Sequence, residues 1–318
     1  PMNGTFTFLS RPSDPGSLDT LSYAWTVNGM PLPSETGPTL SLQVPQGGPT
    51  NIGLTMTDSD GGATSDTVQV RVLTPNPDNV TLINPPGVSR LIVYGLGAPT
   101  GTGDRIDGSA LTIPVEIEDD APGNHTLIGG SADDVIVGGP GSDSLIGNSG
   151  ADSLYANHGD DYLRGGFGND WYVVIPGSSP VLDEGLTSGL DPNRTDDQGP
   201  VVNTVDFSQA ETGLTFDLRI NDGTPQHVDQ LAGRDNTVAI IGSFDQMIGS
   251  KLGDVLYANS SGNTLVGGGG SDILYGASGG DSLVAGSMPG DPGTTGTPNT
   301  LIGGGGNDII YGGLGGDS

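Results

Sequence analysis

The chain of 318 residues contains no cysteine, which excludes disulfide bonds and thiolate metal sites. It has only 9 lysine and arginine residues against 38 aspartate and glutamate residues, so its formal net charge is −29. Nucleic acids and anionic membranes are bound by clustered basic residues, and neither is expected as a partner. No apolar run approaches the roughly 18 residues of a membrane-spanning helix, so membrane insertion is not expected. Cations are the expected partners.

Aspartate and glycine are the abundant residues. The acidic residues are 33 aspartates and 5 glutamates, and the chain has 57 glycines and 24 prolines. Aspartate favours turns and ligates hard cations. This much glycine and proline is typical of disordered chains unless a sequence period organises it, so finding a period decides the class of protein.

Residues 1–75 alternate short β-rich runs with turns of glycine, proline and aspartate, which predicts a small all-β domain. The segments YAWTVNG (23–29) and LTMTDSDGGATSDTVQVRV (54–72) resemble the PKD-like and Ig-like β-sandwich modules of bacterial surface proteins. Asp58 and Asp60 begin either a calcium loop or a hairpin turn, and Asp-Gly between alternating strands favours the turn. The proline-containing residues 76–90 are expected to be a linker.

From Gly129 onward the sequence repeats every nine residues in the pattern G-G-x-G-x-D-x-U-x, where U is a large apolar residue. The first array occupies residues 129–173, and a second array begins near Ile240. The sixth-position residues are Asp134, Asp143, Asp152, Asp161 and Asp170 in the first array, and Asp245, Asp254, Asn263, Asp272, Asp281, Asn299, Asp308 and Asp317 in the second.

A nonapeptide divides into a six-residue turn and a three-residue strand, so two nonapeptides close one coil. Successive coils then lie about 4.8 Å apart, the spacing of hydrogen-bonded strands. Asp134, Asp152 and Asp170 should line one edge of the coils, and Asp143 and Asp161 the other. The eighth-position apolar residues should fill the core. Asn299 follows Asp281 by 18 residues, so Met288–Pro298 is expected to preserve this register.

The turns offer oxygen ligands for Ca²⁺. Glycines at the first, second and fourth positions permit positive φ and direct backbone carbonyls toward a shared point. Carbonyls and carboxylates together form an oxygen-only shell, which suits Ca²⁺ better than Mg²⁺. The candidate metal ligands are Asp134, Asp143, Asp152, Asp161, Asp170, Asp245, Asp254, Asp272, Asp281, Asp308 and Asp317, with Gly130, Gly139, Gly141, Gly150, Gly159, Gly166, Gly168, Gly268, Gly270, Gly304 and Gly306.

Stacked aspartates oppose folding unless a cation lies between them. Carboxylates about 5 Å apart repel by roughly 3 kcal/mol at an effective dielectric of about 20. The core between three-residue strands is too thin to offset this repulsion, so metal binding should drive folding. Asn263 and Asn299 replace aspartates, Ala132 replaces a glycine and Lys251 adds a positive charge, and each should weaken its site.

The two arrays resemble the calcium-binding repeats of RTX (repeats-in-toxin) proteins, over roughly residues 91–318. The resemblance implies a parallel β-roll, or β-solenoid, that binds several Ca²⁺ ions. It also implies that the chain leaves the cell unfolded, by type I secretion, and folds outside. The expected class is all-β: a sandwich over residues 1–75, a first roll over 91–175, a connecting segment with irregular strands over 176–239, and a second roll over 240–318.

The chain shows no catalytic constellation, so it is not expected to be an enzyme. Gly276–Gly280 matches GxSxG but lies within a repeat turn, and His125, His158 and His227 are expected at the surface.

Two functions remain open. The chain is either a secreted structural or adhesive protein of the bacterial surface, or the non-catalytic C-terminal secretion and stability module of an RTX hydrolase such as a protease or lipase. A glycan-binding module is a weaker alternative because aromatic residues are only 5% of the chain. Further repeats or a second copy of the chain are expected to cover the C-terminal edge of the roll.

Overall fold

The computed structural model consists of strands and turns. It describes residues 5–9, 21–73, 79–95, 103–119, 122–175, 179–185, 202–228, 236–286, 297–313 and 316–318. These residues form strands β1 to β28 and include no helix, which confirms the expected all-β class. Among them there is accordingly no helix that could cross a membrane.

The N-terminal residues form two small groups of strands around one core. The strands are β1 (Thr5–Leu9), β2 (Ser22–Val27), β3 (Met30–Pro31), β4 (Thr39–Gln43), β5 (Pro49–Thr57) and β6 (Ala63–Val72). β1 pairs with β4, and the order β3-β2-β5-β6 makes an antiparallel sheet. The alternation of apolar and polar residues turns one face of each group inward. The buried residues there are Trp25, Leu40, Val44, Ile52, Val70 and Val72.

The connection between β5 and β6 is a hairpin turn. The Oδ1 atom of Asp58 accepts hydrogen bonds from the amide of Asp60 at 3.0 Å and from the amide of Gly62 at 2.7 Å. Gly61 has a φ of 89°, which a residue with a side chain rarely adopts. The Asp58 carboxylate is therefore used by its own turn, as the Asp-Gly pattern indicates.

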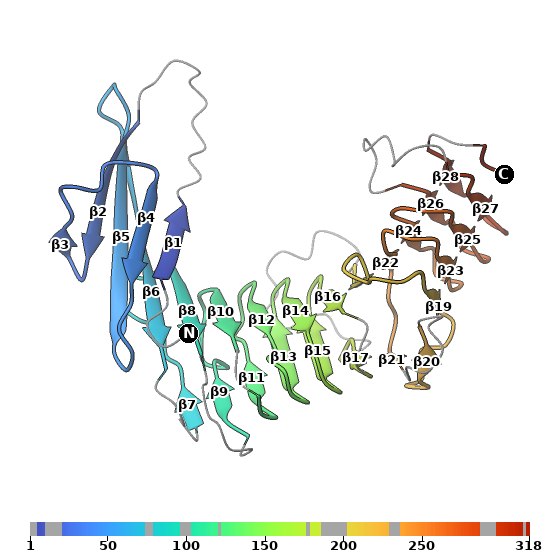
Figure 1. Ribbon diagram of the computed structural model, residues 1–318, viewed down its shortest axis with the longest axis horizontal. Coiled ribbons are helices and arrows are strands. Elements are labelled where there is room, and N and C mark those ends of the chain that lie inside the picture. Colours follow the sequence, from blue (N-terminus) through green and yellow to red (C-terminus); the bar gives the residue numbers. More distant parts are fainter. Residues whose placement is uncertain are drawn as a thin grey trace.

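The N-terminal sheet continues into the rest of the protein. β6 pairs in parallel with β8 (Arg90–Tyr94), which places Arg71 opposite Val93. β7 (Asn79–Thr81), within the residues expected to form a linker, pairs with β9 (Arg105–Asp107). β2, β3, β5 and β6 thus share one sheet of 14 strands with the coils, and Figure 1 shows how this sheet runs from the N-terminal strands into the coils.

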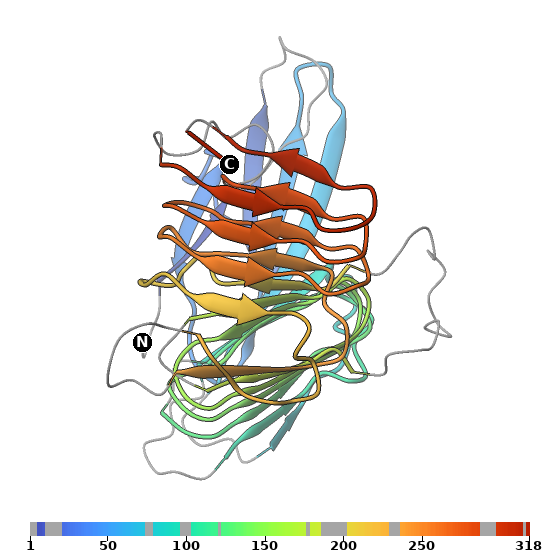
Figure 2. The same cartoon turned by 90° about the vertical axis from the view of Figure 1, so that its right-hand side faces the viewer.

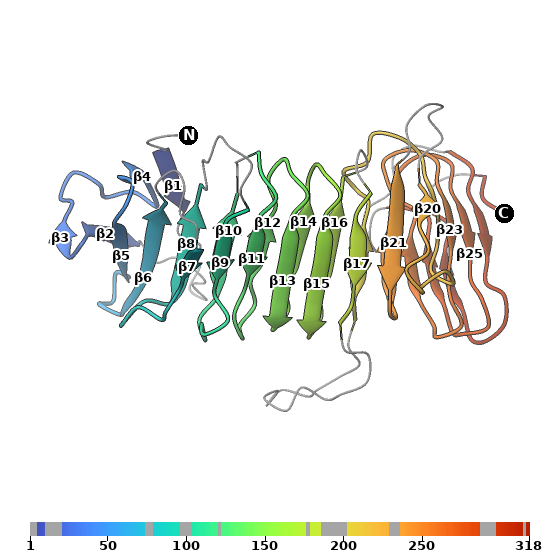
Figure 3. The ribbon, with the colours of Figure 1, turned by 90° about the horizontal axis from the view of Figure 1, so that it is seen from below.

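Beyond β6, successive coils place short parallel strands in two facing layers (Figures 1 and 3). The first sheet continues through β8 with β10 (Val115–Glu118), β12 (Val135–Val137), β14 (Ser153–Ala156), β16 (Trp171–Val174), β18 (Thr204–Asp206), β22 (Gln246–Ile248), β24 (Thr264–Val266), β26 (Ser282–Val284) and β28 (Ile309–Tyr311). The opposite side contains β7 and β9, then β11 (Thr126–Ile128), β13 (Ser144–Ser149), β15 (Tyr162–Phe167), β17 (Val181–Asp183), β21 (Thr237–Ile241) and β20 (Gln226–His227). A separate sheet of β19 (Thr215–Asp217), β23 (Val255–Tyr257), β25 (Ile273–Tyr275) and β27 (Thr300–Ile302) completes that side.

The eighth-position residues form the core between the sheets. Leu145 lies opposite Leu163 in one sheet, and Ile136 lies opposite Leu154 in the other. All four are fully buried. One continuous apolar cluster runs from Leu73 to Leu301. The nine-residue period therefore gives the parallel roll that the sequence predicts.

The residues between the two arrays also contribute coils. β18 pairs with both β16 and β22, and β17 pairs with both β15 and β21. Phe207 and Phe216, whose ring centroids lie 5.1 Å apart, fill this part of the core. The roll is consequently continuous along its first sheet, and only the opposite side is divided.

The expectation that Met288–Pro298 preserves the 18-residue register is wrong. The amide of Asp272 donates to Oδ1 of Asn299, 27 residues later, and the amide of Asp281 donates to Oδ1 of Asp308, also 27 residues later. Asn299 thus lies in the row of Asp272 rather than in the row of Asp281. The coil that contains Met288–Pro298 is therefore longer than the others by the length of one nonapeptide. The last coils stack regularly after it (Figure 2).

Candidate calcium sites

The sixth-position aspartates form rows along the edges of the roll. Asp134, Asp152 and Asp170 lie in successive coils on one edge, and Asp143 and Asp161 lie on the other, as the spacing predicts. The first row continues through Asn203, Asp245, Asn263, Asp281 and Asp308. A further row contains Asp254, Asp272, Asn299 and Asp317.

One oxygen of each stacked carboxylate accepts a hydrogen bond from the neighbouring coil. The amide of Asp134 donates to Oδ1 of Asp152 at 2.8 Å, and the amide of Asp254 donates to Oδ1 of Asp272 at 2.9 Å. Each bond satisfies a turn amide that the short strands leave without a ladder partner. The aspartates therefore hold adjacent turns together as well as carrying charge, a role that the motif does not reveal.

The second oxygen is buried without a hydrogen-bond donor at several of these positions. Within the described part of the chain, this Oδ2 atom has no hydrogen-bond partner at Asp143, Asp152, Asp161, Asp170 and Asp272. A buried carboxylate oxygen without a donor or cation is strongly unfavourable. These atoms are the positions at which a bound cation would stabilise the folded chain most.

Glycine at the first position makes room for that oxygen. A Cβ atom on Gly147 would lie 2.2 Å from Oδ2 of Asp152 and 2.7 Å from the carbonyl oxygen of Gly165. A Cβ atom on Gly267 would lie 2.3 Å from Oδ2 of Asp272. A side chain at these positions would fill the space where carboxylate and carbonyl oxygens converge. The atoms that converge there are all oxygens, and Ca²⁺ prefers oxygen ligands.

Three other candidate aspartates have partners within their own turns. Oδ2 of Asp134 accepts from the amide of Gly130, Oδ2 of Asp254 accepts from the amide of Ser250 at 2.6 Å, and Oδ2 of Asp281 accepts from the amide of Ala277 at 2.7 Å. The carboxylates of these three aspartates keep their places in the rows. Because both of their oxygens accept hydrogen bonds, they depend less on a bound ion. Lys251, which was expected to disturb the Asp254 site, is exposed.

Several of the predicted glycines adopt the backbone conformation that requires glycine. Positive φ is found at Gly150, Gly159, Gly166, Gly168, Gly268, Gly270, Gly304 and Gly306, but not at Gly130, Gly139 or Gly141. At Gly141 close approach is the constraint instead, because a Cβ atom would lie 1.8 Å from the carbonyl oxygen of Gly123. The second- and fourth-position glycines thus allow adjacent turns to stack closely.

Burial raises the pKa of most of these carboxyl groups. The pKa of Asp152 is raised to about 9, by burial first and then by the charges of Asp170 and Asp134. Burial raises the pKa of Asp134, Asp143 and Asp254 to about 6 and that of Asp161, Asp170 and Asp272 to about 7, and it also raises the pKa of Asp245. The common cause is removal from water, which disfavours the charged form. A bound cation would reverse that preference.

The rows include residues that the sequence did not identify. His125 and Asn203 occupy sixth-position places, and His125 is 2% exposed, so the expectation that it lies at the surface is wrong. His158 and His227 are exposed. A hydrogen bond with Asp119 raises the pKa of His125. His125 precedes Asp134 by nine residues and Leu127 by two, which is the signal that could have found it.

Comparison with known families agrees with this geometry. Residues 122–154, 137–172, 248–284 and 295–318 match the family model of the RTX calcium-binding nonapeptide repeat. No similar sequence is found among curated proteins. The chain thus carries RTX repeats, and its repeating turns are calcium-binding sites.

We expect Asp272→Asn to remove one calcium ion and to weaken binding in the adjoining coils. The amide side chain can still accept the 2.9 Å hydrogen bond from Asp254 but lacks the charge that holds the ion. Asp58→Asn is the matched control, because that carboxylate serves a hairpin turn. Calorimetric titration would count the ions, and equal losses in the two variants would contradict the assignment.

The pKa shifts predict opposite pH dependences with and without calcium. The folded carboxyl groups have pKa values of about 6 to 9 against 3.8 in the unfolded chain, so the metal-free roll binds more protons than the unfolded chain between those values. Its free energy of unfolding should therefore fall as the pH rises from about 4 through that range. Calcium affinity should rise over the same range, because protons compete for the carboxylates.

Circular dichroism in a chelator at about pH 5 and about pH 8 would measure the first effect. Greater β structure at the higher pH would contradict it. Calorimetric calcium titrations at the two pH values would measure the second effect.

Proposed function

We propose that this chain is a calcium-gated structural segment of a secreted protein, with a structural or adhesive role at the bacterial surface. The observation that carries the proposal is the set of buried Oδ2 atoms of Asp143, Asp152, Asp161, Asp170 and Asp272, none with a hydrogen-bond donor in the described residues. Such a structure is poorly stable until cations occupy its turns.

Calcium concentration would then decide whether the chain is folded. The binding free energy of the ions becomes folding free energy, because the unfolded chain has no preformed site. Extracellular calcium modules bind at about 10⁻⁴ to 10⁻³ M, far above the calcium concentration inside a cell. The chain would stay unfolded before export and fold outside. RTX repeat proteins are typically exported by type I secretion, and the absence of cysteine suits a chain whose folding depends on metal.

The way the roll is joined to the N-terminal strands supports a structural role. β6 and β8 pair directly, so force applied to the N-terminal strands would pass into the roll through main-chain hydrogen bonds. RTX repeat domains are typically structural and non-catalytic. Figure 1 shows an extended molecule with the N-terminal strands at one end and the last coils at the other. This shape suits a spacer or an adhesive segment.

Self-association is a further part of the proposal. The final described coils expose Ile302, Ile309, Ile310 and Tyr311, each by roughly half of its surface. Among the described residues, β28 also has a neighbouring strand on one side only. Further coils or a second copy of the chain would cover this face.

Small-angle X-ray scattering tests calcium gating directly on the full chain. In chelator we expect a radius of gyration near the roughly 60 Å of an unfolded chain of this length. Millimolar calcium should reduce it sharply, and equal magnesium should not, because Mg²⁺ retains its waters. A radius of gyration that is the same in all three conditions would contradict the proposal, and growth of the particle with concentration in calcium would support self-association.

A further inference from the structure

One row contains a histidine where the other coils carry aspartate or asparagine. His125 occupies the sixth position of the coil before Asp143: its carbonyl accepts from the amide of Ser144, and its own amide donates to Oδ1 of Asp143 at 2.7 Å. The amide of Thr126 donates to the carbonyl of Asp104, which places Asp104 one coil earlier in the row. The imidazole thus stands between carboxylates at a position that aspartate normally fills.

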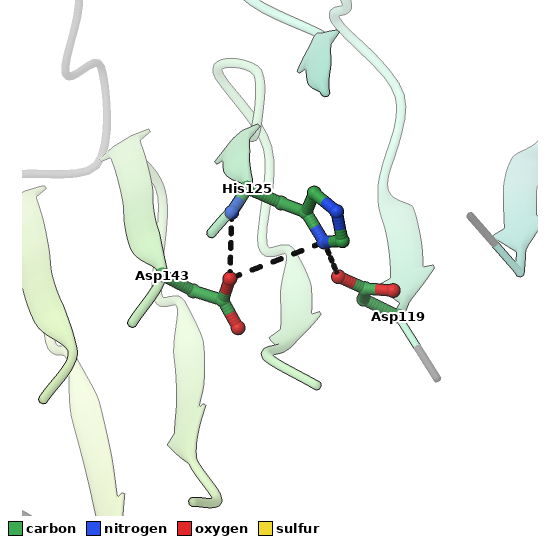
Figure 4. Close-up of side chains that lie close together, drawn as sticks. All are labelled: Asp119, His125 and Asp143. Carbon is green, nitrogen blue, oxygen red and sulfur yellow. Dashed lines mark hydrogen bonds and ion pairs between the residues drawn. The ribbon is translucent and has the colours of Figure 1, made fainter. Parts of the chain in front are cut away.

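The histidine side chain converges with two carboxylates. Its Nδ1 atom forms a short contact with Oδ2 of Asp119 and lies 4.0 Å from Oδ1 of Asp143. One ligand atom from each of the three residues lies within 4.8 Å of the others. Figure 4 shows Nδ1 directed toward both carboxylates and the second ring nitrogen directed away from them. Three different turns or strand ends therefore contribute to one small cluster.

The cluster places three buried carboxyl groups around one imidazole. Asp104, Asp119 and Asp143 are 1%, 6% and 2% exposed, and all three charges act on His125. Within the described residues, Nε2 of His125 and Oδ2 of Asp143 have no hydrogen-bond partner. Buried charges in proteins are paired or coordinate metals.

We propose that Asp119, His125 and Asp143 form a site for a divalent transition metal, best represented by Zn²⁺, separate in kind from the calcium sites. Ca²⁺ takes oxygen ligands almost exclusively, whereas imidazole nitrogen with carboxylate oxygen is a usual ligand set for Zn²⁺. Three protein ligands leave one tetrahedral position for water or for a further carboxylate oxygen. Asp104 stands one coil away and adds negative charge to the same space.

The distances suit a small ion. Zinc bonds of about 2.0 to 2.2 Å place two tetrahedral ligand atoms roughly 3.3 Å apart. The observed 4.0 Å between Nδ1 of His125 and Oδ1 of Asp143 needs only a small movement to match. The proton now shared by Nδ1 and the Asp119 carboxylate would leave as the metal enters. Oδ2 of Asp143 remains directed elsewhere and stays available to a calcium ion.

Burial determines when the metal enters. The side chains of Asp119, His125 and Asp143 are almost completely buried, so an ion has little access once the coils have closed. Zinc should load while the roll folds in calcium. A site near the start of the row would then fix the register of the first coils.

The test compares the full chain with variants after refolding in calcium, with and without Zn²⁺, in metal-stripped buffer. Elemental analysis after removal of free metal should find about one zinc ion per wild-type chain. Co²⁺ in place of Zn²⁺ should give the visible absorption of a site with nitrogen and oxygen ligands. His125→Asp restores the residue usual at this position, and Asp119→Asn removes a ligand outside the sixth-position rows. Both should lose the zinc and the cobalt spectrum while keeping the calcium-induced β signal.

His158→Ala is the matched control, because that histidine is exposed in a turn of the same roll. Its main chain forms an isolated β-bridge with Pro140. It should bind as much zinc as the wild type. The proposal is overturned if the wild type takes up no zinc, if His125→Asp and Asp119→Asn retain it, or if His158→Ala loses it equally. Should His125→Asp fail to fold, Asp119→Asn decides. The calcium-induced signal of the wild type is read separately, so failure of this site and failure of calcium gating are distinguishable.

Discussion

The fold depends on one unfavourable arrangement, the stacking of buried carboxylates in successive coils. Asp134, Asp152 and Asp170 each lie one coil apart, and each is about 1% exposed. Burial and mutual charge raise the pKa of Asp152 to about 9, so the folded chain resists the charged form that the aspartates have in water. A cation between the turns would remove both penalties at once and would couple the presence of calcium to the presence of structure.

The rest of the architecture follows from bringing the turns close enough to share ions. First-position glycines such as Gly147 leave space for a carboxylate oxygen, and fourth-position glycines such as Gly150 adopt positive φ. The core is one layer of eighth-position side chains between short strands, as at Leu154 and Leu163. Each coil mainly contacts its neighbours, so stability should spread along the roll from one coil to the next. The pairing of β6 with β8 extends this dependence to the N-terminal strands.

The nine-residue period predicted much of this because it determines which residues stack. It placed Asp143 and Asp161 on one edge and Leu145 and Leu163 in the core, since equal spacing leaves no other arrangement of two turns per coil. It failed at Asn299, because residues without the motif give no indication of how long their coil is. It also missed His125, whose residue type suggested a surface position although its spacing from Asp134 and Leu127 fits the repeat. The direct pairing of β6 with β8 joins segments on either side of a proline-containing stretch, and no local pattern reveals such a contact.

Circular dichroism of the full chain, first in chelator and then with increasing calcium, measures the central dependence most directly. We predict a largely unstructured chain without metal and a cooperative gain of β structure at about millimolar calcium, the range of extracellular calcium modules. The gain should be reversed by chelator, and equal magnesium should not produce it. A spectrum with full β structure in chelator, unchanged by calcium, would show that the buried carboxylates do not control folding and would contradict the account.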